Sequence, residues 1–402
     1  MQLDERRIEA RALVPGMYVC RLDRPWEGTP FRLQGFLADS PDQIKWVGEN
    51  CKSVWIDVAL GIGPADVARS RVPEAGLLGA FHYRNTADFI EELPQAREAL
   101  AETASAAASL IDAIAAGGAV DAAEVREAVQ PVVQSILRNS DTLFWVNTLR
   151  ASAGYAYSHA INCSMLAAAF GRHLGLPAEL LVDLAGGGLL LDVGKTRLPQ
   201  SLVTRPAALA PEEMARVREH VLQGAEVLES SGEHAPEVIE MVRTHHERWD
   251  GTGYPRRLAG LEIPLYGRIA AIVDCFDAMT TPRPWAAARS RHRALQEIYS
   301  LGDAAFQGEL VEQFISCLGA FPTGSLVELS NGQVAVVMMQ NLSRRLRPRV
   351  MLLTDSCKRL LESFEPVDLM DQSEDLPLSE QLNVVCGLPV GAHGLDPAEL
   401  YL

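Results

Sequence analysis

The sequence is short of positive charge and has no long uncharged apolar run. Its 36 lysine and arginine residues are outnumbered by 52 aspartate and glutamate residues, which gives a formal net charge of −16 at pH 7. Because nucleic-acid polymers and anionic membranes are bound by cationic surfaces, this balance argues against both as partners. It still allows a small phosphate-bearing ligand that is held by local basic side chains or by a metal ion. Runs of about 18 uncharged apolar residues are absent, so we expect no membrane span.

Paired cysteines and an apolar N-terminal segment are also missing. The seven cysteines are scattered and none forms a C-x-x-C pair, which is typical of reduced thiols in a cytoplasmic protein. The first residues, MQLDERRIEARALVPGMYV, carry charges where a signal peptide needs an apolar core. We therefore expect a cytoplasmic protein without a signal peptide. Its 402 residues suffice for two or three folded domains.

The first third of the chain changes from strand-like to helical sequence. Residues 1–80 contain short apolar runs separated by turn signals, which predicts a small β-rich module. Residues 81–140 are rich in alanine and glutamate and are interrupted at Gly117-Gly118, which predicts a connector of two helical stretches.

The remaining chain predicts a helical domain followed by strands. Helical periodicity dominates residues 141–322, and residues 323–402 return to strand-like sequence with a hairpin signal at Asn331-Gly332. The fold prediction is therefore a mainly α protein, in which a helical bundle lies between an N-terminal β-rich module and a short C-terminal β element. Four prolines mark helix starts within the bundle, at Pro177, Pro199, Pro211 and Pro236.

Histidine and aspartate side chains gather in the helical segment, and six of the nine histidines lie between positions 141 and 250. Asp192 and Asp274 lie in the apolar runs LLLDVGK and RIAAIVDCFDAM, where an unpaired carboxylate is costly. A divalent cation would compensate for that cost, and nitrogen and oxygen ligands suit iron, manganese, zinc or cobalt better than calcium. Taken singly, each histidine fits a structural role as well, so spacing alone leaves both interpretations open. The residues concerned are His159, Asp192, His220, His245, His246 and Asp274.

The segment HHERWDGTGYP, at positions 245–255, is the most specific motif. Through it the chain resembles the HD-GYP family of HD-superfamily phosphohydrolases, which degrade the bacterial second messenger cyclic di-GMP. The likeness extends from about Tyr155 to about Gly332 and includes LLLDVGKTRLP and VREHVLQGAEVL. GMYVCRLDRPW and FRLQGF, within the first 70 residues, resemble a module of uncharacterised function that often precedes such domains.

This resemblance implies an HD-type helical bundle with a metal centre. Asp192 would bridge two ions, of which one would also take His220, His245 and His246. The other ion would take His159 and Asp274. Iron or manganese is the favoured metal, with zinc, cobalt and nickel as alternatives and one or two ions per chain.

The resemblance also implies a substrate site. Lys195 and Arg283 match basic residues that bind substrate phosphates, and Gly253-Tyr254-Pro255 matches the loop beside the substrate. Asp192 and Lys195 would take part in the hydrolysis of cyclic di-GMP to linear pGpG, GMP or both. The loop could also contact a signalling protein, and the N-terminal module could regulate the enzyme or form a homodimer.

The sequence departs from the family pattern at three places. Leu191 stands where the family has the histidine of its His-Asp pair, Tyr155 stands where some members have a metal-binding glutamate, and residues 284–286 lack a basic residue. Leucine cannot bind a metal, so we expect the ion shared by His159 and Asp274 to be bound more weakly. Packing is the favoured role of Tyr155.

Three interpretations of function remain open at this stage. The first is an active phosphodiesterase of reduced activity. The second is a catalytically silent protein that binds cyclic di-GMP or a signalling partner, and the third is a phosphohydrolase of another nucleotide.

Overall fold

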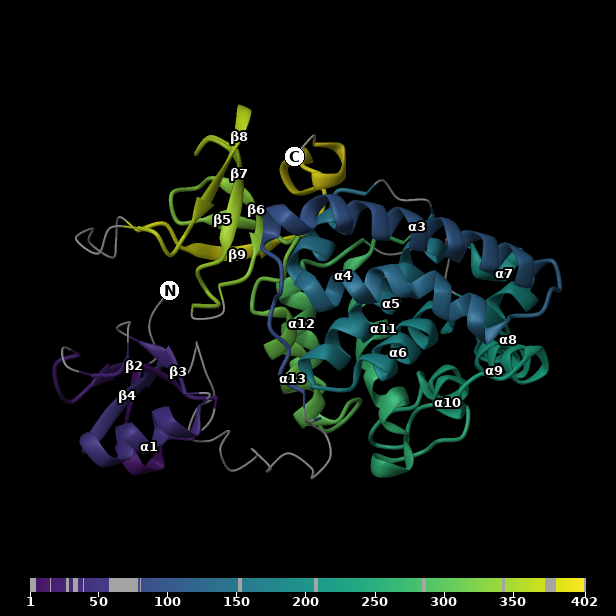
Figure 1. The fold of residues 1–402 in the computed structure, drawn as a ribbon, viewed down its shortest axis with the longest axis horizontal. Coiled ribbons are helices and arrows are strands. Elements are labelled where there is room, and N and C mark those ends of the chain that lie inside the picture. The colour runs from purple at the N-terminus through teal and green to yellow at the C-terminus, as the bar shows by residue number, and fades with distance from the viewer. Residues whose placement is uncertain are drawn as a thin grey trace. The chain divides into compact units, whose positions relative to one another are not determined.

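A computed structural model gives the fold of the chain (Figure 1). The chain forms two compact units, one built largely from residues up to 74 and one built largely from the residues after them. We describe each unit by itself. The structure describes residues 5–14, 16–26, 29–31, 35–38, 40–57, 79, 81–150, 154–205, 209–283, 287–341, 344–372 and 381–400.

The described residues of the N-terminal unit form an antiparallel sheet and a helix that the sequence prediction missed. The strands follow the order β1-β4-β2-β3. Helix α1 (Pro41–Asn50) lies where the sequence analysis expected only strands and turns. It begins in a capping box, since Asp42 N donates to Ser40 Oγ and Ser40 N donates to Gln43 Oε1. The strands are β1 (Glu5–Glu9), β2 (Tyr18–Leu22), β3 (Phe36–Leu37) and β4 (Ser53–Asp57).

Helices build most of the second unit, as predicted. The long helices α3 and α4 pack against each other, and Gly117 in the turn between them has a φ of 87° that favours glycine (Figure 1). In chain order the helices are α3 (Phe89–Ala115), α4 (Ala122–Thr148), α5 (Tyr155–His173), α6 (Ala178–Leu190), α7 (Gln200–Val203), α8 (Pro211–Arg218), α9 (His220–Ser231), α10 (Pro236–Thr244), α11 (Leu265–Thr280), α12 (Arg291–Ser300) and α13 (Gly308–Leu318).

The predicted proline starts agree with the helix boundaries. Pro211 and Pro236 are the first residues of α8 and α10, while Pro177 and Pro199 directly precede α6 and α7. Proline suits these positions because a helix leaves its first N–H groups without an internal partner.

The segment after Pro211 forms two helices. Helix α8 ends at Arg218, and His220 begins α9. Glu219 between them has φ −63° and ψ −20°, and its N–H donates to Arg216 O. This tight turn ends one helix and starts the next without a glycine or proline to mark it.

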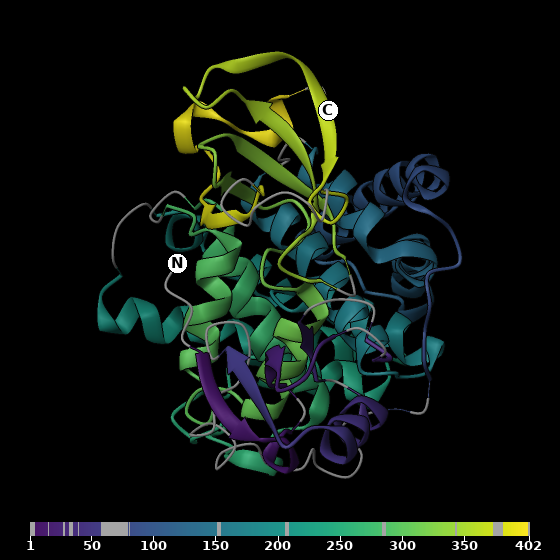
Figure 2. The same ribbon diagram turned by 90° about the vertical axis from the view of Figure 1, so that its left-hand side faces the viewer.

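An antiparallel sheet with the order β8-β7-β6-β5-β9 completes the second unit. The predicted hairpin at Asn331-Gly332 joins β5 to β6, and Gly332 has a φ of 84°. Strand β6 packs against α4 and β9 against α12, so the sheet lies beside the helices (Figure 2). The strands are β5 (Leu326–Leu329), β6 (Val334–Met339), β7 (Arg349–Thr354), β8 (Leu360–Asp368) and β9 (Val384–Leu388).

The predicted fold class is confirmed: a mainly helical domain with a small N-terminal strand module and a C-terminal sheet. Among the described residues, no helix combines the length and the apolar character that crossing a membrane requires. The exact boundaries at residues 80, 140 and 322 stay a prediction.

Candidate metal centre

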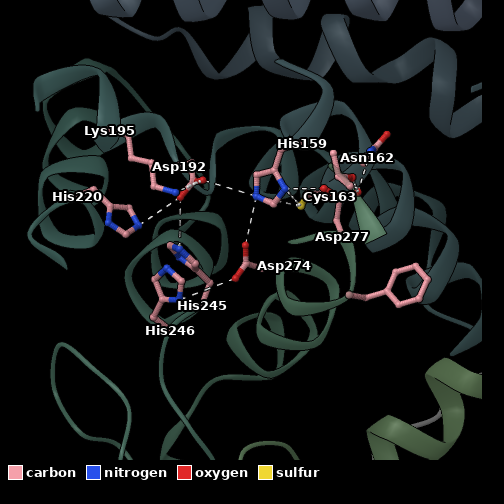
Figure 3. A network of polar contacts seen from close by, with 12 residues as sticks. His159, Asn162, Cys163, Asp192, Lys195, His220, His245, His246, Asp274 and Asp277 are labelled. Atoms are coloured by element: carbon pink, nitrogen blue, oxygen red, sulfur yellow. Dashed lines mark hydrogen bonds and ion pairs between the residues drawn. The ribbon is translucent and has the colours of Figure 1, made fainter. Parts of the chain in front are cut away.

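Six side chains from five separate segments meet in the helical domain (Figure 3). They are the six residues that the sequence analysis singled out. Asp192 lies between His220 and His245 on one side and His159 on the other, with Asp274 below (Figure 3). Their positions are His159 on α5, Asp192 directly after α6, His220 at the start of α9, His245 and His246 directly after α10, and Asp274 on α11.

Glycine allows the segment after α6 to approach α9. A Cβ atom on Gly194 would lie 1.9 Å from the carbonyl oxygen of His220, so no larger residue fits there without moving the backbone. Gly188 likewise lets α6 pack on α5, because a Cβ atom there would lie 2.7 Å from the carbonyl oxygen of Cys163. These two close approaches bring Asp192 beside both His220 and His159.

The first group of donors comprises Asp192, His220, His245 and His246, whose candidate ligand atoms all lie within 4.8 Å of one another. Asp192 Oδ1 is 3.3 Å from His220 Nε2 and 3.9 Å from His245 Nε2. Two atoms bound to one ion at about 2.0–2.2 Å each lie about 2.8 Å or more apart when the angle between them is at least 90°. The observed separations therefore match ligands of a shared ion.

Hydrogen bonds fix the imidazole protons of His220 and His245. The Nδ1 atom of His220 donates to Val217 O, and that of His245 donates to Val242 O, each at 2.7 Å. In a neutral ring Nε2 then carries a lone pair. Within the described part of the chain, these two Nε2 atoms and Asp192 Oδ1 are buried without a well-formed hydrogen bond. Three electron-rich atoms that face one another in this way fit a cation.

The second group of donors surrounds the Nε2 atom of His159. This atom is 3.2 Å from Asp274 Oδ1 and 3.6 Å from Asp192 Oδ2, and the His159 side chain is 3% exposed. Asp192 therefore places Oδ1 beside the first group and Oδ2, which also accepts from Lys195 Nζ at 2.5 Å, beside the second.

The electrostatics of the first donor group favour a charged Asp192 and a neutral His245. Burial alone would raise the pKa of Asp192, but the Lys195 ammonium, 2.5 Å away, and His220 hold that pKa well below its usual range. Burial also lowers the pKa of His245 to about 4, helped by His220, so this ring is neutral at pH 7. Both forms are the ones that bind metal.

Three family models match the chain in succession. A domain of unknown function covers residues 5–125, an HD domain covers residues 131–310, and a KOW domain associated with the HD domain covers residues 326–374. The HD match contains all six clustered residues.

Curated relatives carry the comparison further. A cyclic di-GMP phosphodiesterase of Pseudomonas aeruginosa is 30% identical over 90% of this chain and 89% of its own length. The chain belongs to the HD-GYP family. A cyclic di-GMP phosphodiesterase of Thermotoga maritima is 33% identical over 40% of this chain and 44% of its own length. Among solved structures, Bd1817, an HDG"Y"P protein from Bdellovibrio bacteriovorus, covers 77% of this chain and 98% of its own, with 16% identity and a TM-score of 0.46.

The HD-GYP motif folds into a loop that is stabilised by hydrogen bonds between its own residues. The Glu247 side chain is buried and accepts hydrogen bonds from Arg256 N at 2.7 Å and Leu258 N at 3.1 Å. Gly253 lies against the backbone of the same segment, where a Cβ atom would be 2.3 Å from Arg248 N. Glu247 and Gly253 thus both help to shape the loop.

Tyr254 links this loop to the metal centre. Its ring stacks on that of His246 with 4.7 Å between centroids, and its N–H donates to His246 O. The Arg218 guanidinium also lies over the Tyr254 ring, 4.9 Å from its centroid. The structure therefore brings Tyr254 beside a predicted ligand, with Gly253 and Pro255 as its chain neighbours.

Replacing Glu247 with alanine should destabilise the HD-GYP loop and the domain that carries it. Two backbone N–H groups would lose a charged, buried acceptor, which we expect to lower the free energy of unfolding by about 3 kcal/mol. Chemical denaturation measures this change. Glu262→Ala is the matched control. Exposed Glu262 accepts one hydrogen bond, from Ala259 N at the start of the 3₁₀ helix Gly260–Glu262, and its loss should cost less than about 1 kcal/mol. Equal effects of the two variants would contradict the role given to Glu247.

The structure also shows the surroundings of Leu191, Tyr155 and Arg283, of which the first two are predicted departures from the HD-GYP pattern. Leu191 is 1% exposed and belongs to the apolar core of the domain. Tyr155 stacks on His159 with 5.4 Å between ring centroids, which agrees with a packing role. Arg283 forms no hydrogen bond or ion pair with the six clustered residues within the described ranges, and its Nε atom is buried without a hydrogen bond. Residues 284–286 lie outside the described residues.

Sequence reasoning missed Asp277 and Cys163. Asp277 Oδ2 accepts from His159 Nδ1 at 2.6 Å, and Cys163 Sγ lies 3.7 Å from both nitrogens of that ring. The spacing could have indicated both residues. Asp277 follows Asp274 by three residues and Cys163 follows His159 by four, which places each pair on the same face of a helix.

Proposed function

We propose that the chain is a metal-dependent phosphodiesterase that hydrolyses cyclic di-GMP to linear pGpG, GMP or both. The observation that carries the proposal is the convergence of four imidazoles and two carboxylates from separate segments around unpaired, electron-rich atoms. The names of the relatives in Pseudomonas aeruginosa and Thermotoga maritima support the choice of substrate.

Each donor group is proposed to hold one ion. Asp192, His220, His245 and His246 would hold the first ion, and Asp192, His159 and Asp274 would hold the second. This mixture of nitrogen and oxygen donors suits iron or manganese, with zinc, cobalt and nickel as alternatives. When bound, such ions supply hydroxide near neutral pH and polarise phosphoryl oxygens.

The chain's own residues would orient the phosphate and balance its charge. Burial would lower the pKa of Lys195, but Asp192 raises it, so the ammonium stays charged beside the carboxylate. It could donate hydrogen bonds to a phosphoryl oxygen as negative charge grows there. Arg283 is proposed as a second phosphate contact, and Tyr254 would line the substrate site through its stack on His246. Because Leu191 cannot bind a metal, the second ion should be held more weakly and activity should be reduced.

Metal analysis combined with a product assay tests the proposal. Protein purified without oxygen should contain up to two transition-metal ions per chain and should convert cyclic di-GMP to pGpG or GMP. A panel of other cyclic dinucleotides serves as the specificity control. No product with ferrous iron or manganese supplied would refute the proposed activity, and faster cleavage of another nucleotide would refute the proposed substrate.

A catalytically silent binding protein is the second candidate function. It is favoured by one observation, the burial of Leu191 in the apolar core at the position of a family ligand. It predicts that cyclic di-GMP binds without product. A protein contact at the Gly253–Pro255 loop and dimerisation through the N-terminal module are further proposals, which pull-down and light-scattering measurements can test.

A further inference from the structure

The far side of the His159 ring faces a second set of polar groups (Figure 3). His159 Nδ1 lies 2.6 Å from Asp277 Oδ2. The other oxygen, Asp277 Oδ1, accepts from Asn162 Nδ2 at 2.7 Å and from Thr281 Oγ1 at 3.0 Å. Both His159 and Asp277 are almost fully buried. The carboxylate therefore has a fixed position and has hydrogen bonds on both of its oxygens.

His159, Cys163 and Asp277 also lie close enough together to be considered as a metal site. The separation of 2.6 Å between Nδ1 and Oδ2 argues against that role, because two ligands of one ion lie about 2.8 Å or more apart. The contact between His159 and Asp277 is a hydrogen bond.

We propose that Asp277 is a positioning residue for the second ion. Its carboxylate keeps the proton of His159 on Nδ1 and so leaves the lone pair of Nε2 directed at Asp274 and Asp192. The inference rests on the metal centre of the proposed function. Leu191 supplies no imidazole, so His159 is the one imidazole among the three proposed donors to the second ion. The orientation and protonation of this ring should therefore have a large effect on binding of that ion.

Metal titration of the whole chain tests this role. After removal of metal with a chelator, calorimetric titration with manganese should resolve two binding events in the wild type. In Asp277→Asn the amide cannot accept from both His159 and Asn162, so the second event should weaken by about 10–100-fold. The first event should not change, because its four donors do not contact Asp277.

Asp141→Asn is the matched control for loss of a carboxylate in the same domain. Asp141 accepts from Thr323 Oγ1 at 2.7 Å and from Gln340 N at 3.2 Å, and neither partner belongs to the metal centre. It should lower the unfolding temperature and leave both binding events unchanged. If Asp277→Asn lowers the unfolding temperature but binds both ions as the wild type does, Asp277 is merely structural and the inference fails.

A measurement on the wild type serves if the variant does not fold. Nitrogen-15 spectra should show His159 protonated on Nδ1, with its signal identified by its loss in His159→Gln. A proton on Nε2 in the metal-loaded protein, or a single ion per chain, would overturn the inference. A chain that binds two ions but releases no product would refute the proposed activity and leave this inference intact.

Discussion

Replacing Asp192 with alanine should remove both ions and abolish turnover. The two oxygens of Asp192 face different donor groups, with Oδ1 3.3 Å from His220 Nε2 and Oδ2 3.6 Å from His159 Nε2. Its loss also leaves the Lys195 ammonium without its carboxylate partner. Because loss of a residue that only supports a ligand costs about 10–100-fold, we expect turnover to fall by at least about 100-fold.

The matched control for Asp192→Ala is Asp183→Ala. Asp183 lies on α6, close to Asp192 in the chain, and pairs with half-exposed Arg126 at 2.5 Å. Loss of this pair should cost about 1 kcal/mol or less and leave metal content and product formation unchanged. Elemental analysis and chromatography of the nucleotide products measure both variants. Full metal content in Asp192→Ala would contradict the bridging role.

Replacing Leu191 with histidine should strengthen binding of the second ion. A ligand nitrogen would be added beside Asp192, and we expect affinity to rise by about 10-fold or more, equivalent to at least about 1.4 kcal/mol. Turnover should rise with it. In the metal-free protein the same substitution should be destabilising, because it buries a polar ring in the apolar core that holds Leu191. Metal titration tests the expected gain in affinity, and denaturation with and without manganese tests the expected loss of stability in the metal-free protein.

Leu191→Phe separates the effect of the nitrogen from the effect of ring size. It adds an aromatic ring of similar shape without a ligand atom, so neither metal affinity nor turnover should rise. An increase with phenylalanine equal to that with histidine would show that packing, not coordination, limits the second ion.

The sequence predicted those parts of the fold that leave a periodic or a local signal. Prolines at helix starts and the Asn331-Gly332 hairpin are of this kind, since each constrains the backbone directly. Helix α1 was missed although Ser40 and Gln43 form its capping box, because a ten-residue helix among strands adds little periodicity. Strand β9 owes its place to pairing with β5, a contact that no local pattern specifies.

The candidate site was predictable residue by residue only through the motif. Spacing left each histidine with a structural alternative, and the structure is what brings ligand atoms of His220, His245 and His246 within 4.8 Å of one another. The Asp277–His159 contact joins residues 118 positions apart, so it depends on how α5 packs on α11. Asp192 can face both donor groups because Gly194 lets the segment after α6 pack closely against the start of α9.

Anomalous scattering from crystals of the metal-loaded protein tests the central claim most directly. Data collected at the iron or manganese absorption edge should show a peak within ligand distance of Asp192, His220, His245 and His246, with a weaker neighbouring peak beside His159 and Asp274. Peaks at other residues, or none in protein that binds these metals in solution, would contradict the account.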